Sequence, residues 1–326
     1  MTLKSIKPLK LFDDKIAKEI INWEWNWYYK PILDILKPNY VVNDNNTLVE
    51  ALKSGAIYYQ NDGFYSKTGR FSNRIALELE KIGARYSKYG RCYRLVKDKL
   101  PQNLLWAIET VNAEVFTKVT AIKKVMDVTL GELDNIIKNL KLVDIAEEMV
   151  LNLEKRFNDN LKANKIETIA PKMTDYRARE FARNYTDNLE FYIKKWQPEE
   201  ITKMREVVGQ MAIDGESRLT IQEYIQNQFK VSQRKAKFLA RNESSIAVTE
   251  YLSAKYQEEG FTEFKWITNL DGRERPLHKE LNGKIFRFDN PPIIDERTGQ
   301  RGLPGETYNC RCTFVPILDR KILNSV

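Results

Sequence analysis

The stretch from Ala236 to Ala254 has the sequence AKFLARNESSIAVTEYLSA, and its apolar residues recur every three or four positions. This spacing places them on one side of an α-helix and predicts a buried stripe. The stripe consists of Ala236, Leu239, Ala240, Ala247, Tyr251 and Ala254. Glu243 falls on the same stripe, so its carboxylate either has a cationic or hydrogen-bonding partner or lies half in solvent at the helix edge. We predict that Ser232 caps this helix, that the helix reaches about Tyr256, and that a shorter helix covers 219–229.

Beyond this helix the sequence changes to short strands and loops. Residues 261–268 are expected to form a strand with Phe264 and Trp266 on one face, because alternate side chains of a strand point the same way. Asn282-Gly283 predicts a tight turn into a second strand. A loop rich in proline and glycine follows at 290–305. These features predict a small module that contains β-structure and many loops.

Two of the three cysteines, Cys310 and Cys312, stand near the end of this module. In an extended chain they share a face and Arg311 points the other way, with the two Cα atoms about 6.5 Å apart, so a disulfide between them would be strained. Together with His278, the only histidine, and with Asp271, they could bind a zinc ion. Four protein ligands leave no position for water, so such a zinc would be structural. The alternative is that both cysteines are small buried hydrophobic residues and that His278 caps a turn.

The residues around this cluster follow one another in a distinctive order. In this sequence the ordered elements are Ala240-Arg241-Asn242-Glu243, Gly260, Trp266, Asp271-x-Arg273-x-x-x-x-His278, Leu281-x-Gly283, Pro304-Gly305 and Asn309-Cys310-Arg311-Cys312. This order resembles the phage Mu F-like head-morphogenesis family over about 214–316. Asn242 departs from the family pattern, which more often has threonine there.

The resemblance implies a minor head protein of a tailed double-stranded DNA bacteriophage, present in low copy near the portal. Such a protein would act in head assembly, DNA packaging or DNA delivery. Its implied partners are the portal protein, capsid or scaffold proteins and packaged DNA, and it would be oligomeric in the virion after synthesis in the host cytoplasm. If no metal is bound, Arg275 or Arg311 could pair with Glu243 and join the helix to the strand that carries the cysteines.

The remainder of the chain predicts a mainly α-helical protein with small α+β parts. We expect an N-terminal aromatic-rich helix and a small α+β unit in 1–100, a helical scaffold in 101–213 and the C-terminal module in 214–326. Within 1–50, Trp23 and Trp27 continue the apolar spacing of a helix. The neighbouring aromatic residues cannot all share that face, so some are exposed or contact a partner.

The small α+β unit and the scaffold have recognisable turn and cap residues. Asp62-Gly63 predicts a hairpin turn, and Ser72 predicts a helix cap. In the scaffold, Thr174 is expected to cap a helix that runs to Trp196. Gln197-Pro198 is expected to open a separate helix that ends near Asp214-Gly215.

The net charge of +8 permits contact with nucleic acid but does not require it. The densest basic run comprises Lys230, Arg234, Lys235, Lys237 and Arg241. A solvated helix face explains this run more simply than a phosphate-binding stripe, although both interpretations stay open. No apolar segment is long enough to cross a membrane, and the first ten residues do not resemble a signal peptide.

An enzymatic function is the competing hypothesis. A metal-dependent nuclease or a toxin-like effector packaged in the virion could use His278 as a general base beside Asp271 and a metal. The sequence contains no P-loop, no glycine-rich dinucleotide-binding turn and no serine nucleophile elbow. We therefore expect a structural virion protein rather than an enzyme.

Overall fold

The computed structural model describes residues 3–37 and 48–317. The first ten residues and the end of the C-terminal module therefore lie partly outside the described residues. By their contacts, the described residues form two units. The first unit combines the segments 1–22, 137–193 and 233–326, and the second combines 23–136 and 194–232. Each unit is assembled from segments that lie far apart in the sequence, whereas the predicted domains were consecutive segments. The domain boundaries expected at 100 and 213 stay a prediction.

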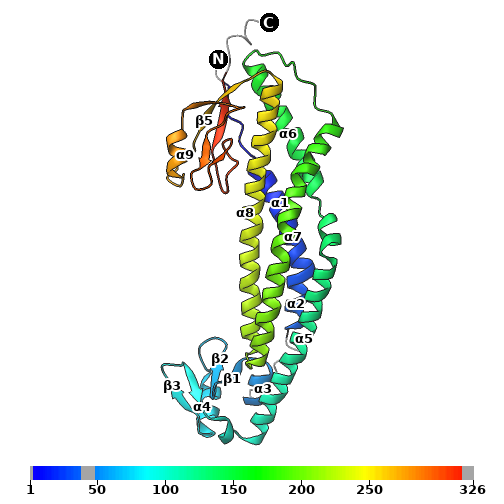
Figure 1. The fold of residues 1–326 in the computed structure, drawn as a ribbon. Helices are drawn as coiled ribbons and strands as arrows, with labels where there is room; N and C mark the ends of the chain where they lie inside the picture. The colour runs from blue at the N-terminus through cyan, green and yellow to red at the C-terminus, as the bar shows by residue number, and fades with distance from the viewer. Residues whose placement is uncertain (1–2, 38–47, 318–326) are drawn as a thin grey trace. The chain divides into compact units, whose positions relative to one another are not determined.

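The second unit contains the predicted small α+β fold together with parts of the long helices. Its elements are the π-helix η1 (Glu24–Tyr29), α2 (Lys30–Ile35), α3 (Leu48–Lys53), β1 (Ile57–Gln60), β2 (Gly63–Ser66), α4 (Asn73–Lys81), β3 (Arg85–Ser87), β4 (Cys92–Arg94), the 3-10 helix η2 (Lys97–Lys99) and most of α5 (Gln102–Lys138). The four strands form an antiparallel sheet in the order β1-β2-β4-β3, with α3 and α4 beside it (Figure 1). Cys92 is fully buried, as expected of a packed thiol.

The hairpin between β1 and β2 forms one residue earlier than predicted. Asn61 and Asp62 take the two central turn positions, with φ of 46° and 55°, and Gly63 pairs with Gln60 inside the ladder. Asn and Asp are the non-glycine residues that tolerate this left-handed conformation best, which is why the turn does not need the glycine. The Ser72 cap is confirmed, since its side chain accepts a hydrogen bond from the backbone N–H of Ile75 at 3.3 Å.

The N-terminal helix changes its pitch where the aromatic residues gather. Helix α1 (Lys10–Trp23) continues directly into the π-helix, whose wider turn advances the buried face by one residue. As a result Tyr28 is buried, and Trp27 is 59% exposed instead of lying on the apolar face. The expectation for Trp27 was wrong, whereas the prediction that some aromatic residues are exposed is confirmed.

Helix α7 (Asp175–Ile213) runs without a break through Pro198. The separate helix expected to open at Gln197-Pro198 was therefore wrong. Both ends of α7 follow the sequence signals: Thr174 accepts a hydrogen bond from the Arg177 N–H at 3.2 Å, and Gly215 has a φ of 73°.

Helix α8 (Arg218–Glu258) is likewise continuous, so Ser232 is not a cap. Its hydroxyl donates instead to the buried carboxylate of Glu24 at 2.7 Å. The Gln197 side-chain amide donates to the same carboxylate. A serine that satisfies a buried acceptor inside a helix has the same local sequence as a capping serine, and only the position of Glu24 distinguishes the two.

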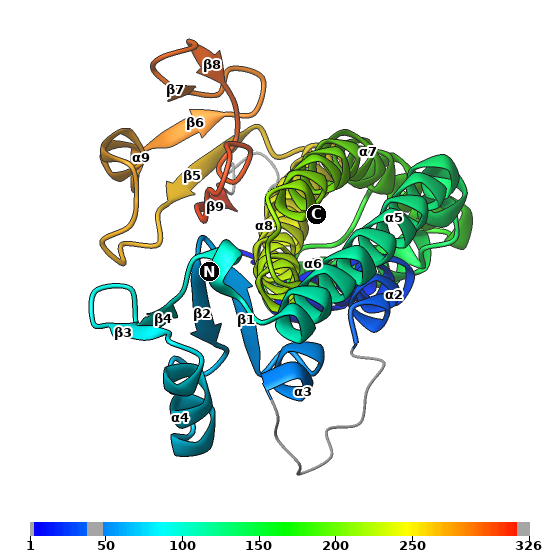
Figure 2. The same ribbon diagram turned by 90° about the horizontal axis from the view of Figure 1, so that it is seen from below.

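The first unit carries the C-terminal module. It contains α6 (Leu142–Ala163), the N-terminal part of α7, the C-terminal part of α8, β5 (Glu263–Ile267), α9 (Pro276–Leu281), β6 (Ile285–Arg287), β7 (Ile293–Asp295), β8 (Gln300–Arg301) and β9 (Thr313–Pro316). Strands β6, β5 and β9 form an antiparallel sheet in that order, and β7 pairs with β8 (Figure 2). Phe264 and Trp266 are both fully buried on one face of β5, as predicted. None of the helices in the described residues is long and apolar enough to cross a membrane.

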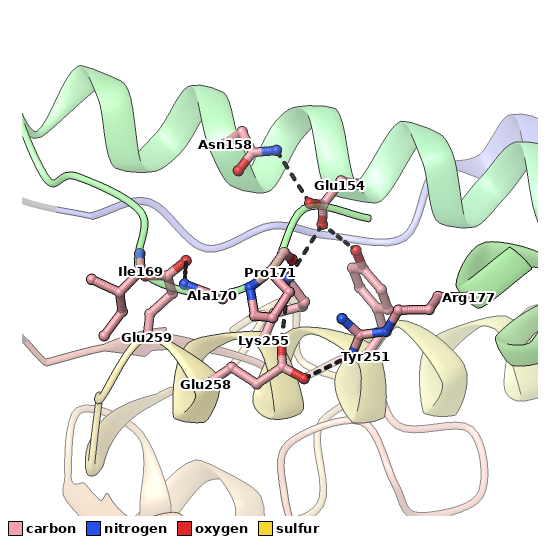
Figure 3. A network of polar contacts seen from close by, with 10 residues as sticks. All are labelled: Glu154, Asn158, Ile169, Ala170, Pro171, Arg177, Tyr251, Lys255, Glu258 and Glu259. Atoms are coloured by element: carbon pink, nitrogen blue, oxygen red, sulfur yellow. Dashed lines mark hydrogen bonds and ion pairs between the residues drawn. The ribbon is translucent and has the colours of Figure 1, made fainter. Parts of the chain in front are cut away.

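The loop between α6 and α7 is fastened to the end of α8 by buried charges (Figure 3). The Glu259 carboxylate accepts hydrogen bonds from the backbone N–H groups of Ile169 at 2.7 Å and Ala170 at 3.3 Å. Glu259 is only 3% exposed, so these donors replace water around its charge.

Lys255 provides a second attachment in the same place. Its ammonium group lies 3.8 Å from the Glu154 carboxylate and 3.4 Å from that of Glu258, and it reaches the Pro171 carbonyl at 3.5 Å. The Tyr251 hydroxyl donates to Glu154 at 2.5 Å. These polar contacts join α6, the loop and α8 beside the apolar packing of Phe157 on Tyr256.

We expect Glu259→Gln to lower the free energy of unfolding by about 1–3 kcal/mol, because the uncharged amide accepts less strongly from the two N–H groups. Urea denaturation of the full chain measures this change. Glu167→Gln is the matched control, since Glu167 is exposed on the same loop. Equal stability of both variants would contradict a fastening role for Glu259.

Candidate metal centre

Three buried side chains with metal-ligating atoms meet between α9 and the segment that leads into β9. The donor atoms of His278, Cys310 and Cys312 all lie within 4.8 Å of one another. The Nδ1 atom of His278 is 3.4 Å from the Cys310 sulfur and 3.6 Å from the Cys312 sulfur. Both thiols are free and face the same side, as the spacing predicted. This group could hold a metal ion such as zinc.

Hydrogen bonds on the far side of the imidazole orient it toward the sulfurs. The Nε2 atom of His278 lies 3.1 Å from the Ile294 carbonyl, and a proton on Nε2 leaves Nδ1 free to bind a metal. The Thr268 hydroxyl donates to the His278 carbonyl at 2.7 Å and accepts from the Trp266 indole N–H at 3.1 Å. Trp266 thereby helps to position the histidine, which explains its place in the motif.

The two thiols have opposite tendencies to ionise. The hydrogen bond from the neighbouring Cys312 thiol, with a further contribution from His278, lowers the pKa of Cys310. The same thiol–thiol contact, together with burial, raises the pKa of Cys312.

Asp271 is not part of this group, so the four-ligand set predicted from the sequence is corrected to three ligands. Its carboxylate accepts hydrogen bonds from Arg311, one of them at 2.9 Å, and from the Arg273 guanidinium at 2.9 Å. The Arg311 guanidinium holds the pKa of Asp271 well below its usual range. Two guanidinium groups thus retain the carboxylate outside the donor cluster.

A pocket opens beside the three donors. It is lined by Thr268, Asn269, Arg273, Glu274, Arg275, His278, Asn309, Cys310, Arg311 and Cys312. The three-donor group therefore opens onto this pocket. The predicted set of four protein ligands would have left no coordination position open to the pocket.

The expected ion pair between Glu243 and an arginine of the module was wrong. Arg311 pairs with Asp271, and Arg275 donates to the Thr307 hydroxyl at 2.8 Å and the Tyr308 carbonyl at 2.7 Å. Glu243 accepts a hydrogen bond from the Asn242 side chain at 2.9 Å, and burial raises its pKa. The Asn242 amide thus supplies the hydrogen-bonding partner that a carboxyl group on a buried stripe requires.

Asn309 makes the connection between α8 and the cysteines instead. Its backbone N–H donates to the Asn242 side-chain oxygen at 2.7 Å, and its own side-chain oxygen accepts from Arg241 at 2.8 Å. Asn309 has a φ of 57°, so the chain turns sharply immediately before Cys310. The Arg241-Asn242 pair therefore fixes the position of the turn that presents the cysteines.

Two glycines of the motif have clear steric reasons. Gly283 has a φ of 78°, and its N–H donates to the Trp266 carbonyl at 2.8 Å, which confirms the predicted tight turn. Gly305 has a φ of 104°, and a Cβ atom there would lie 2.6 Å from the Thr249 hydroxyl. Only glycine allows the loop to approach α8 this closely.

The basic run expected as a DNA contact lies on the surface of α8. Lys230, Arg234, Lys235, Lys237 and Arg241 are all exposed. Arg241 is already engaged with Asn309 and lies over the Phe238 ring at 5.7 Å. Exposed side chains agree with both interpretations, the solvated helix face and the phosphate contact, and a DNA-binding experiment distinguishes them.

Comparison with known families now identifies the module. The family model described as "Phage Mu protein F like protein" matches residues 202–315. This segment is a phage Mu protein F-like domain, and the family is one of head-morphogenesis proteins. The match begins slightly before the position near 214 at which the sequence resemblance was expected to start.

Two curated relatives match part of the chain. An uncharacterized protein of Haemophilus influenzae is 31% identical over 127 residues, which cover 39% of this chain and 27% of the relative. A protein of Enterococcus faecalis named NAD(+)--arginine ADP-ribosyltransferase EFV is 29% identical over 114 residues, covering 32% of this chain and 23% of the relative. The chain thus spans about a quarter of the length of these relatives. No solved structure matches it significantly.

We expect Asn242→Ala to lower the free energy of unfolding by about 1–3 kcal/mol, because it leaves the Asn309 N–H without its acceptor. Glu243→Gln should change stability much less, because glutamine keeps a side-chain oxygen that can accept the hydrogen bond from Asn242. Thermal denaturation of both variants at neutral pH measures the difference. A larger loss for Glu243→Gln would support the ion pair that the structure does not show.

Proposed function

We propose that this protein is a minor head protein of a tailed double-stranded DNA bacteriophage and acts near the portal in head assembly, DNA packaging or DNA delivery. The observation that carries the proposal is the phage Mu protein F-like domain at 202–315. Two residues of the resemblance have structural roles here, because Arg241 and Gly305 both lie where α8 meets the module.

The fold supports a role in assembly. Helix α8, like α7, contributes to both units, and it carries the residues that hold the cysteine turn. The portal protein and capsid or scaffold proteins are the proposed partners, in an oligomeric arrangement within the virion.

Mass spectrometry of purified proheads and mature heads tests the virion proposal. We expect peptides of this chain in the particles at a low, defined ratio to the portal protein. Cross-linking before digestion should join lysines of this chain to the portal. Absence from both proheads and mature heads, while the chain is present in the infected cell, would overturn the proposal.

A packaged effector is the second candidate function. It is favoured by the relative named as an arginine ADP-ribosyltransferase, although that likeness covers less than a quarter of the relative. An effector, unlike a head protein, would consume NAD or nick plasmid DNA after purification, and particles lacking it would still assemble. Normal heads in its absence would therefore favour the effector.

The basic run on α8 is a further proposed contact with packaged DNA. Its five cationic side chains are exposed, as phosphate contacts require. Binding of this kind weakens steeply as salt increases. No retardation of duplex DNA at low salt would leave the run as a solvated helix face.

We also propose that the three-donor group binds one zinc ion that stabilises the loop-rich module. Metal analysis of the full chain should find about one zinc per chain, and a chelator should lower the melting temperature, because metal binding is coupled to folding in small modules. His278→Ala and Cys310→Ser should lose the metal.

Cys92→Ser is the matched control for the metal experiment, because Cys92 is equally buried but lies in the other unit. It should keep the full zinc content even if its stability falls. Zinc content that is unaffected by His278→Ala would overturn the assignment of the site.

A further inference from the structure

The pocket beside the three donors contains a carboxylate that no sequence argument singled out. Glu274 lines this pocket together with His278, Cys310 and Cys312. Its Oε2 atom is buried and has no hydrogen-bond partner among the described residues. Leaving a buried polar atom unpaired is costly, so the position calls for a partner that comes from the pocket.

Three protein donors do not complete the coordination of zinc. The ion is almost always four-coordinate and tetrahedral in structural sites, and centres with three protein ligands keep a fourth position for water or another small molecule. All three donors line the same pocket, whereas the far side of the imidazole is occupied by the Ile294 carbonyl. A fourth ligand on a metal held by these donors would therefore come from the pocket side.

Glu274 is not one of the donors that meet in this group. The cluster whose donor atoms lie within 4.8 Å of one another comprises the histidine and two cysteines but not Glu274. A carboxylate that lines the same pocket can accept a hydrogen bond from a ligand on the metal. Carboxylates in such positions tune the affinity of a metal site by about 10–100-fold.

The charges around the pocket limit what this ligand can be. Arg273, Arg275 and Arg311 line it alongside Glu274, so the wall is positive apart from one carboxylate. Asp271 neutralises part of the charge of Arg273 and Arg311 by its ion pairs. A small anion is attracted by this wall, and a water molecule is held by the carboxylate.

We propose that the His278/Cys310/Cys312 centre is an open metal site, in which a fourth position facing the pocket takes an exchangeable water or small anion and Glu274 accepts the hydrogen bond of the bound water. This inference rests on the metal part of the proposed function and is independent of the virion assignment. Glu274 is a positioning residue for that ligand.

The test uses the full chain loaded with Co²⁺, whose visible absorption reports the ligands in its coordination sphere, and sodium azide as the small anion. We expect azide to shift the absorption bands of the wild type in a saturable way. Glu274→Gln should bind Co²⁺ with the same stoichiometry and thiolate absorption. Its azide affinity should increase about tenfold, because the variant removes a negative charge and the acceptor that holds the competing water.

Glu280→Gln is the matched control, since Glu280 is exposed on α9, the short helix that carries His278, and does not line the pocket. It should behave as the wild type does. Wild-type bands that do not respond to azide, with a response gained in Glu274→Gln, would overturn the open position and make Glu274 the fourth ligand. An azide affinity unchanged by Glu274→Gln would overturn the role of Glu274.

Failure of the wild type to bind stoichiometric Co²⁺ or Zn²⁺ would overturn this inference together with the metal part of the proposed function. Detection of the chain in phage heads would still stand in that case. Conversely, an azide-sensitive centre in a chain absent from heads would preserve the open site and remove the virion proposal.

Discussion

The hydrogen bond from the Asn309 backbone to the Asn242 side chain is the contact on which the arrangement of the C-terminal module depends. It joins the last turn before Cys310 to the middle of α8, and Arg241 reinforces it from the neighbouring position. Because the cysteines follow this turn directly, their position relative to His278 is set by the helix. The helix, in turn, is positioned in its unit by the buried contacts of its C-terminal half.

The polar residues of the motif form two separate layers around the donors. The inner layer is neutral and buried: Thr268 and the Ile294 carbonyl hold the histidine helix and its ring. The outer layer is charged and more exposed, and Asp271 with its two arginines forms it. This division keeps the Asp271 carboxylate away from the thiols. It also leaves the pocket beside the donors accessible.

Buried charges also determine how far the long helices extend. The Glu24 carboxylate accepts hydrogen bonds from the Ser232 and Gln197 side chains. Helix α8 continues through Ser232, and helix α7 continues through Gln197. At the other end of α8, Glu259 and Lys255 retain the loop that follows α6. A buried charge requires specific partners and therefore selects one arrangement of the helices, whereas apolar surfaces alone would tolerate several.

The sequence by itself determined the helical and strand periodicities, the caps at Ser72 and Thr174 and the order of motif residues that identifies the module. These features depend on neighbours within a few positions, and local rules describe them well. It could not determine that Asp271 leaves the donor group, that Asn309 replaces an arginine as the link to α8, or that Glu274 faces the pocket. Those outcomes depend on which of several suitable polar partners lies nearest in space, and only the tertiary structure decides between partners that are separated by tens of residues in the chain.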